Sequence, residues 1–316
     1  MYVDLPERAL REYRSTQREP ADFDGFWSRT LGEAAAHDLD VRAVAVRTDL
    51  TTIDVVDLTF NGFDGQPVRA WLRMPRQRPA RLAGVVEFNG YGAGRGHPLD
   101  SLLLASAGYA HLLMDTRGQG TGATPDPVGA GPSVPGFLTR GIESPDSYYY
   151  RRVFTDAVRA VEAVRSLPDV DPGRVAVVGA SQGGGIALAV GGLVPDLRAL
   201  VVQAPFLCDF PRATVITDAA PYAEVAAFLK ARRGDVAGAL RTLSYFDGIA
   251  FSRRATAPAW FSTGLMDDIC PPSTVFAAYN EYAADKKIAV WPYNGHDAGG
   301  SHDTAHCLEI LRDVLR

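Results

Sequence analysis

Short apolar runs alternate with longer amphipathic segments along most of the chain. Eight runs bounded by turn-forming residues predict strands at 53–60, 68–74, 84–88, 109–115, 175–179, 199–203, 259–263 and 288–292. The turn at 61–65 would join the first two strands as a hairpin, and helical patterns such as 146–167 lie between later strands. Strands that alternate with helices predict a mostly parallel α/β sheet covered by helices on both faces.

Three segments depart from this alternation. Residues 1–40 predict a helical N-terminal extension, residues 204–255 a mainly helical insertion between two strands, and residues 118–136 a long irregular loop rich in Pro and Gly. A length of 316 residues fits one elaborated α/β domain better than two, so we expect residues 1–316 to form a single domain. Long segments inserted between the strands of such a sheet usually form part of a binding or catalytic site. We therefore expect the insertion to lie near the active site.

Composition narrows the possible partners. The chain has 32 Lys and Arg against 37 Asp and Glu, a net charge of −5, and no basic run that could follow a phosphate backbone, so nucleic acid is not an expected partner. The N-terminal residues mix both charges without an apolar stretch, which favours a cytoplasmic protein that binds no membrane. Cys208, Cys270 and Cys307 are widely spaced, which favours reduced, buried thiols over a disulfide framework or a zinc site.

One serine, Ser181, stands between Gly179 and Gly183, after a predicted strand and before a helix of small apolar residues. This strand, turn and helix are typical of a nucleophile elbow, in which only glycine fits beside the serine and the hydroxyl is held clear of the sheet. The alternative is a glycine-rich helix start that merely packs against the sheet. A phosphate-binding loop is disfavoured, because neither Gly-x-Gly-x-x-Gly nor a Walker lysine follows the strand.

A serine nucleophile needs a base and an orienting acid, which in α/β-hydrolases follow it in the order acid, then histidine. Asp267 and Asp268 follow the strand at 259–263, and His296 follows the next strand. We favour Asp267 because it comes first off the strand, with Asp268 as the alternative acid or as a cap of the next helix. The remaining histidines lie far upstream or in the last predicted helix: His37, His97, His111, His302 and His306.

The oxyanion of a tetrahedral intermediate needs two donors. The backbone N–H of Gln182, directly after the serine, is the first, and the glycine-rich loop at 88–96 offers the backbone N–H of Tyr91 as the second. Arg117 follows another strand, and we expect it to be a structural ion-pair partner beneath the site.

Several longer motifs resemble carbohydrate esterase family 7, which comprises acetyl xylan esterases and cephalosporin C deacetylases: GASQG (179–183), RGQ (117–119), SYYYRRVFTDA (147–157), TLSYFD (242–247), GLMD (264–267) and CPPSTVFAAYN (270–280). The resemblance implies an α/β-hydrolase fold, with Ser181 as nucleophile, Asp267 as acid, His296 as base and the amides of Tyr91 and Gln182 as oxyanion hole. It also implies a ring-shaped homohexamer. Family members usually have Glu after the catalytic histidine, where this chain has Asp297.

The expected activity is removal of acetyl groups from O-acetylated xylo-oligosaccharides, sugars and small acetate esters, without metal or cofactor. The alternatives are a deacetylase dedicated to a natural product such as cephalosporin C, and a catalytically silent binding protein with the same fold. Large apolar side chains near the N-terminus could pack on their own domain, but we expect them to contact a neighbouring subunit: Tyr2, Leu5, Leu10, Tyr13, Phe23, Phe26 and Trp27.

Overall fold

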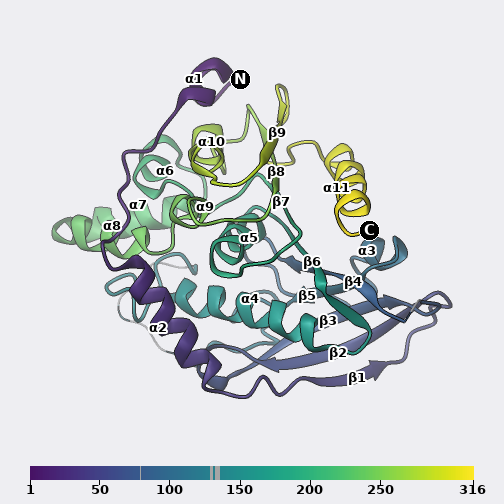
Figure 1. The fold of residues 1–316 in the computed structure, drawn as a ribbon. Coiled ribbons are helices and arrows are strands. Elements are labelled where there is room, and N and C mark those ends of the chain that lie inside the picture. Colours follow the sequence, from purple (N-terminus) through teal and green to yellow (C-terminus); the bar gives the residue numbers. More distant parts are fainter. Residues whose placement is uncertain (79, 129–130, 132–135) are drawn as a thin grey trace.

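The computed structural model describes residues 1–78, 80–128, 131 and 136–316 (Figure 1). Its nine-stranded sheet has the order β1-β2-β3-β5-β4-β6-β7-β8-β9. The strands are β1 (Arg42–Val46), β2 (Ile53–Asn61), β3 (Pro67–Pro75), β4 (Leu82–Phe88), β5 (Ala110–Met114), β6 (Val170–Ala180), β7 (Ala199–Gln203), β8 (Ala259–Gly264) and β9 (Lys286–Trp291). All eight predicted strands are present.

The sheet is mixed, with an antiparallel part and a longer parallel part. β1, β2, β3 and β5 pair antiparallel in turn, whereas β5, β4, β6, β7, β8 and β9 run parallel. The mostly parallel prediction is therefore confirmed, and the carboxyl ends of β4, β6, β8 and β9 meet at one edge. Strand β1 was not predicted, although it carries a short apolar run at 43–46. It is an edge strand with little burial, and Val44 is 65% exposed.

Helices cover both faces of the sheet (Figure 1). Helices α4 (Tyr149–Ser166), α5 (Gln182–Leu193) and α10 (Pro272–Glu281) pack on one face around the larger hydrophobic core. Helices α3 (Leu103–Ser106) and α11 (Ser301–Val314) cover the other face with a smaller core. None of the described helices is long and apolar enough to cross a bilayer.

The N-terminal extension contains α1 (Glu7–Glu12) and α2 (Phe23–Ala35), joined by a non-helical segment. Leu10, Phe23, Phe26 and Trp27 are buried within their own chain, so the expectation that these side chains reach a neighbouring subunit was wrong for all four. The Trp27 ring stacks on Phe154 at 5.9 Å between centroids, and aromatic side chains from α4 and the insertion account for the burial of Trp27. Leu10 packs in a separate cluster with Leu265 and Phe276.

The insertion is helical, as predicted. It contains α6 (Phe210–Ile216), α7 (Tyr222–Ala231), the short 3₁₀ helix η2 (Arg233–Asp235), α8 (Val236–Ser244) and α9 (Gly248–Ser252). The predicted turn of the first hairpin holds a second 3₁₀ helix, η1 (Phe63–Gly65). The irregular loop predicted at 118–136 lies partly outside the described residues, which omit 129–130 and 132–135.

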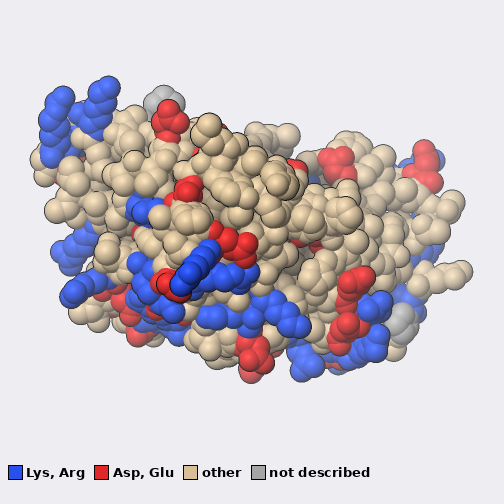
Figure 2. All heavy atoms as spheres, turned by 90° about the horizontal axis from the view of Figure 1, so that it is seen from above, with Lys and Arg blue, Asp and Glu red and all other residues tan. Residues whose placement is uncertain are grey.

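Surface charge is mixed on the face shown in Figure 2. Lys and Arg side chains lie beside Asp and Glu side chains there, and broad uncharged surface separates the charged groups. This pattern differs from the continuous basic stripe that is typical of proteins that track a phosphate backbone.

Candidate active site

Ser181 occupies a strained turn between β6 and α5. Its φ of 55° and ψ of −121° lie in a region that L-residues rarely adopt, at a cost on the order of 1–3 kcal/mol. Backbone hydrogen bonds hold the turn in place, since the Ser181 N–H donates to the carbonyl of Gln203 and the Ser181 carbonyl accepts from the N–H of Phe206, both at 2.9 Å. The geometry is that of a nucleophile elbow.

The glycines around Ser181 are required by close backbone approach. A Cβ on Gly179 would lie 2.3 Å from the carbonyl carbon of Gly183, and a Cβ on Gly183 would lie 2.0 Å from the carbonyl oxygen of Phe88. A Cβ on Gly185 would lie 2.2 Å from the carbonyl oxygen of Phe206. Glycine at these positions therefore lets α5 begin against the ends of β4 and β7, with the serine at the edge of the sheet.

Asp267 and His296 are in direct contact. The Nδ1 atom of His296 lies 2.9 Å from Oδ2 of Asp267, and the Asp267 side chain is fully buried. The other carboxylate oxygen accepts hydrogen bonds from the N–H groups of Ile269 and Cys270, both at 2.9 Å. A carboxylate held by two amides in this way fixes the His296 ring in one orientation and leaves Nε2 free to face a substrate.

The alternative acid and histidines do not make this contact. Asp268 is exposed, and its carbonyl oxygen, not its carboxylate, accepts a hydrogen bond from Thr217. His111 is buried in β5 beside Glu87, at 2.7 Å from its carboxylate. His302 lies on α11 against Trp291, with 5.7 Å between ring centroids. The structure thus pairs the predicted acid and base with each other.

The loops after β8 and β9 are held together by backbone contacts and by Asp297. The N–H of Met266 donates to the carbonyl of Asn294 at 2.9 Å, and a Cβ on Gly264 would lie 2.3 Å from the carbonyl oxygen of Gly295. The Asp297 carboxylate accepts from the Asn294 amide at 3.0 Å and from the Gly295 N–H at 3.1 Å. The aspartate that replaces the family's glutamate therefore stabilises the turn that carries His296.

The two expected oxyanion donors are linked through one side chain. Gln182 Nε2 donates to the carbonyls of Asn89 and Gly90, both at 3.2 Å. In a trans peptide the C=O and N–H groups point in opposite directions. Since Gln182 holds the Gly90 carbonyl, the N–H of Tyr91 in the same peptide points away from that side chain. The Gln182 side chain thus orients the peptide that carries the Tyr91 N–H.

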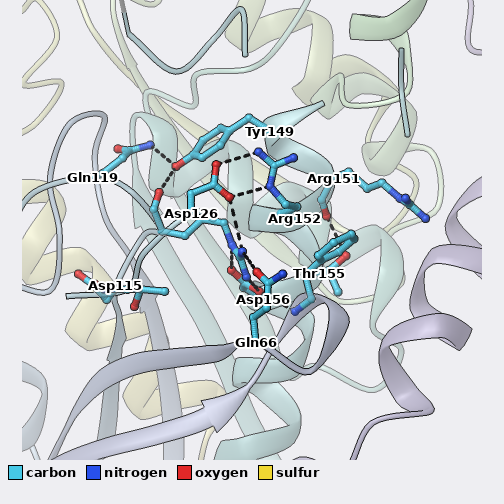
Figure 3. A network of polar contacts seen from close by, with 12 residues as sticks. Gln66, Asp115, Gln119, Asp126, Tyr149, Arg151, Arg152, Thr155 and Asp156 are labelled. Atoms are coloured by element: carbon cyan, nitrogen blue, oxygen red, sulfur yellow. Dashed lines mark hydrogen bonds and ion pairs between the residues drawn. The ribbon is translucent and has the colours of Figure 1, made fainter. Parts of the chain in front are cut away.

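A buried polar network lies behind this link (Figure 3). Gln119 donates to the Tyr149 hydroxyl at 2.9 Å. It also donates to the Gln182 side chain at 2.9 Å and accepts from the Gly92 N–H at 2.7 Å. The Tyr149 hydroxyl in turn donates to the carbonyl of Arg117. Sequence reasoning gave no role to Gln119, although the RGQ motif of the family resemblance marked its position.

Arg117 anchors this network as an ion-pair partner, as expected. Its guanidinium binds both carboxylate oxygens of Asp156, at 2.6 and 2.8 Å, and Gln66 at 2.6 Å (Figure 3). Burial alone would lower the pKa of Arg117, but the carboxylates of Asp156 and Asp126 raise it, so the cation is retained in the interior.

The sequence predicts Cys270 as a buried thiol, and the structure also places it next to Ser181. Burial raises the pKa of Cys270 well above its usual value, and a hydrogen bond with the Ser181 hydroxyl acts in the opposite direction. Among the described residues no hydrogen bond joins Ser181 to His296, a contact that often forms only when substrate is bound. The thiol therefore keeps its proton beside Ser181.

The three cysteines are unpaired, with Cys208 and Cys270 buried and Cys307 half-buried. Within the described ranges, no cluster of three or more His, Cys, Asp or Glu side chains has a geometry that could hold a metal ion.

Comparison with known proteins identifies relatives over nearly the whole chain. A curated acetyl esterase, Axe7A of Xylanibacter ruminicola, is 30% identical over 311 residues, which cover 94% of this chain and 68% of the relative. The solved acetyl xylan esterase from Paenibacillus sp. R4 is 36% identical with a TM-score of 0.94, covering 98% of this chain and 100% of its own. Acetyl xylan esterase 1 from Thermoanaerobacterium sp. JW/SL YS485 is 33% identical with a TM-score of 0.91, covering 98% and 99%.

More distant structures share the fold. The acylaminoacyl peptidase of Pyrococcus horikoshii superposes with a TM-score of 0.62 at 17% identity and covers 84% of this chain and 42% of its own. The sheet therefore has the α/β-hydrolase arrangement that the sequence predicted. The acetyl xylan esterase family model matches residues 1–314, and with the relatives above it shows that this chain belongs to the acetyl xylan esterase family.

Proposed function

We propose that this chain hydrolyses acetyl esters of xylo-oligosaccharides, sugars and other small alcohols, with Ser181, His296 and Asp267 as its catalytic triad. Family membership supports a carboxylic ester hydrolase that acts on acetyl groups. The observation that carries the assignment of residues is the 2.9 Å contact between His296 and the buried Asp267, at the sheet edge where Ser181 occupies its strained turn.

Each group has a defined task in this reaction. His296 Nε2 takes the proton of the Ser181 hydroxyl as its oxygen attacks the acetyl carbonyl carbon, while Asp267 holds the Nδ1–H and stabilises the resulting cation. The amides of Tyr91 and Gln182 donate to the oxyanion. Collapse returns the proton from His296 to the departing alcohol and leaves an acetyl-enzyme. His296 then activates a water that releases acetate and regenerates Ser181.

Acyl chain length tests the preference for acetyl. We expect the buried Cys270 and Phe206 near Ser181 to leave room for little more than a methyl group, and each excess methylene in a tight cavity costs about 1–3 kcal/mol. Turnover of 4-nitrophenyl esters should fall steeply beyond propionyl. Equal or faster turnover of octanoate would contradict an acetyl-specific enzyme and indicate a general lipophilic esterase.

The alcohol can be identified with a second panel. Acetylated xylo-oligosaccharides, acetylated monosaccharides and cephalosporin C would be compared by kcat/KM. We expect the carbohydrate esters to be the better substrates, because the relatives are named as acetyl xylan esterases. A clear preference for cephalosporin C would instead favour a dedicated natural-product deacetylase.

Assembly and location are further parts of the proposal. We expect a homohexameric ring, supported by the edge strand β1 with its exposed Val44 and by the exposed Tyr2 and Val3. Such a ring would narrow the route to Ser181, so small oligosaccharides should be hydrolysed faster than intact xylan. A mass near 34.0 kDa from light scattering, which is the mass of one chain, would contradict the ring.

The three unpaired cysteines favour a location in the cytoplasm, which cell fractionation would test.

A further inference from the structure

Glu224, on α7 of the insertion, meets the side chain of the expected oxyanion donor Tyr91. The Tyr91 hydroxyl lies 2.8 and 2.7 Å from the two carboxylate oxygens of Glu224 and donates its proton to them. The same hydroxyl accepts from the N–H of Phe137 at 2.5 Å and of Leu138 at 3.1 Å. Leu138 also donates to the Glu224 carboxylate at 3.0 Å. The Glu224 carboxylate thus links helix α7 to the loop that contains Tyr91 and to the segment that contains Leu138, which are far apart in the sequence.

The backbone around Glu224 is shaped to admit its carboxylate. Gly136 has a φ of +116°, and a Cβ at this position would lie 2.0 Å from Oε1 of Glu224 and 2.2 Å from its carboxyl carbon. A glycine is therefore needed on both conformational and steric grounds. The Tyr91 ring packs edge-on against Phe137 at 5.7 Å and Phe206 at 5.9 Å between centroids. The phenol is held by packing as well as by hydrogen bonds.

The pKa shifts of Tyr91 and Glu224 are consistent with a protonated phenol that donates a hydrogen bond to a carboxylate. Burial raises the pKa of Tyr91, so the hydroxyl keeps its proton. Burial also raises the pKa of Glu224, while hydrogen bonds from Tyr91 and from the amides of Leu138 and Phe137 lower it. A charge-assisted hydrogen bond of this kind is stronger than one between neutral groups.

Tyr91 is thus fixed from two sides. Behind the loop, the Gln182 amide holds the carbonyl of Gly90, which belongs to the same peptide as the Tyr91 N–H. On the other side, Glu224 holds the phenol. A residue fixed at both its backbone and its side-chain end has little freedom to turn its N–H away from a developing oxyanion, and such preorganisation is a main source of catalytic power.

We propose that Glu224 is a positioning residue that couples the helical insertion to the oxyanion hole by fixing Tyr91. This inference rests on the proposed function, because it takes the Tyr91 N–H as an oxyanion donor. Glu224 acts through Tyr91 and makes no contact with the reacting atoms in this role. Because the carboxylate is negative, as is the oxyanion, its contribution comes from geometry and not from direct electrostatic attraction.

The test compares Glu224→Ala, Glu224→Gln and Tyr91→Phe with the wild type, using 4-nitrophenyl acetate and active-site titration so that rates refer to functional enzyme. Glu224→Ala should lower kcat about tenfold or more, below the ~10²–10³ lost with a whole oxyanion donor, while KM changes less than about threefold. Glu224→Gln keeps an acceptor oxygen for the phenol and should recover most of kcat. Adding Glu224→Ala to Tyr91→Phe should cause no further loss of kcat, because the carboxylate then has no phenol hydroxyl left to hold.

A transition-state analogue separates positioning from a general structural effect. An alkyl trifluoromethyl ketone forms a tetrahedral serine adduct that carries the oxyanion, so its Ki should rise in Glu224→Ala by the same factor as kcat/KM falls. Asp235→Ala is the matched control, since this half-buried insertion residue pairs with Arg232 and the substitution should change neither quantity.

Two outcomes would overturn the inference while leaving the esterase assignment intact. The first is wild-type kcat per active site in Glu224→Ala, with only a lower thermal midpoint. The second is a lower kcat with an unchanged Ki for the ketone. Failure of the proposed function would look different, as absence of esterase activity in the wild type or full activity in Ser181→Ala.

Discussion

The turn at Ser181 and the loop at His296 are held in place in different ways. Around Ser181, backbone approaches backbone so closely that Gly179, Gly183 and Gly185 leave no room for a Cβ. Around His296, side chains add to the backbone contacts, because Asp267 fixes the ring and Asp297 fixes the preceding turn. The serine turn should therefore be damaged by added atoms, and the histidine loop by removed polar groups.

The largest effect is expected from removal of triad groups, since triad members act as a unit. Ser181→Ala, Asp267→Asn and His296→Ala should each lower kcat on the order of 10³ to 10⁶-fold, measured with 4-nitrophenyl acetate, while far-ultraviolet circular dichroism stays unchanged. Asp268→Asn is the matched control and should be mild. If Asp268→Asn proved as damaging as Ser181→Ala while Asp267→Asn kept most activity, the acid would be misassigned.

The next effect tests the steric side of the comparison. Gly183→Ala places a methyl group 2.0 Å from the backbone carbonyl oxygen of Phe88, which cannot move aside as the end of a flexible side chain could. This change should cost about 3 kcal/mol or more of unfolding free energy. Gly25→Ala in α2 has nothing within 4 Å of the new Cβ and should be neutral or stabilise by about 0.5–1 kcal/mol. Equal urea midpoints for the two variants would show that the turn at Ser181 can relax.

A smaller effect is expected in the histidine loop. Asp297→Ala removes the acceptor for Asn294 and Gly295 and should cost about 1 kcal/mol of stability and roughly tenfold in kcat. Asp297→Glu, which restores the usual family residue, should keep most activity. The two variants would be compared by kcat and by urea denaturation. Wild-type kcat in Asp297→Ala would show that backbone contacts alone hold His296.

The smallest effect on catalysis is expected from a carboxyl group outside both loops. Asp247 is fully buried, and its carboxyl group caps α9 by accepting a hydrogen bond from the N–H of Ile249. Burial is the main cause, and the nearby charge of Asp209 the second cause, that raises the pKa of Asp247 to about 7. Since the folded state holds this proton more tightly than the unfolded chain, the Asp247 contribution to stability should decrease as pH rises from about 4 to about 7.

Asp247→Asn should remove this pH dependence and leave kcat at pH 7 within about threefold of wild type. Urea midpoints at pH 5 and pH 8 would measure it. If the urea midpoint changed between pH 5 and pH 8 by the same amount in wild type and in Asp247→Asn, the pH dependence of stability would not come from Asp247.

Much of the fold and the core of the site could be predicted from local sequence. The eight strands carry apolar runs, and the order Ser181, Asp267, His296 follows strand ends that meet at one sheet edge. The contact of His296 with Asp267 confirms that the structure brings these two residues together, while their catalytic roles remain a prediction.

Other features depend on tertiary contacts that leave no local pattern. Strand β1 has a short apolar run at 43–46 but is mostly exposed, because it pairs with β2 at the edge of the sheet. Burial of Phe26 and Trp27 depends on aromatic partners over a hundred residues away, so the sequence could not show that they fold back onto their own chain. Glu224 lies in an ordinary amphipathic helix, and nothing near it in the sequence indicates a contact with Tyr91.

The central claim is that Ser181 is the nucleophile, activated by His296. The most direct measurement is labelling with a 4-nitrophenyl alkylphosphonate, followed by intact mass and peptide mapping. The account predicts one phosphonyl group per chain on Ser181, loss of activity in proportion to labelling, no adduct in Ser181→Ala and slow labelling in His296→Ala. An active enzyme labelled at another residue, or a Ser181→Ala variant that is still labelled and active, would contradict it.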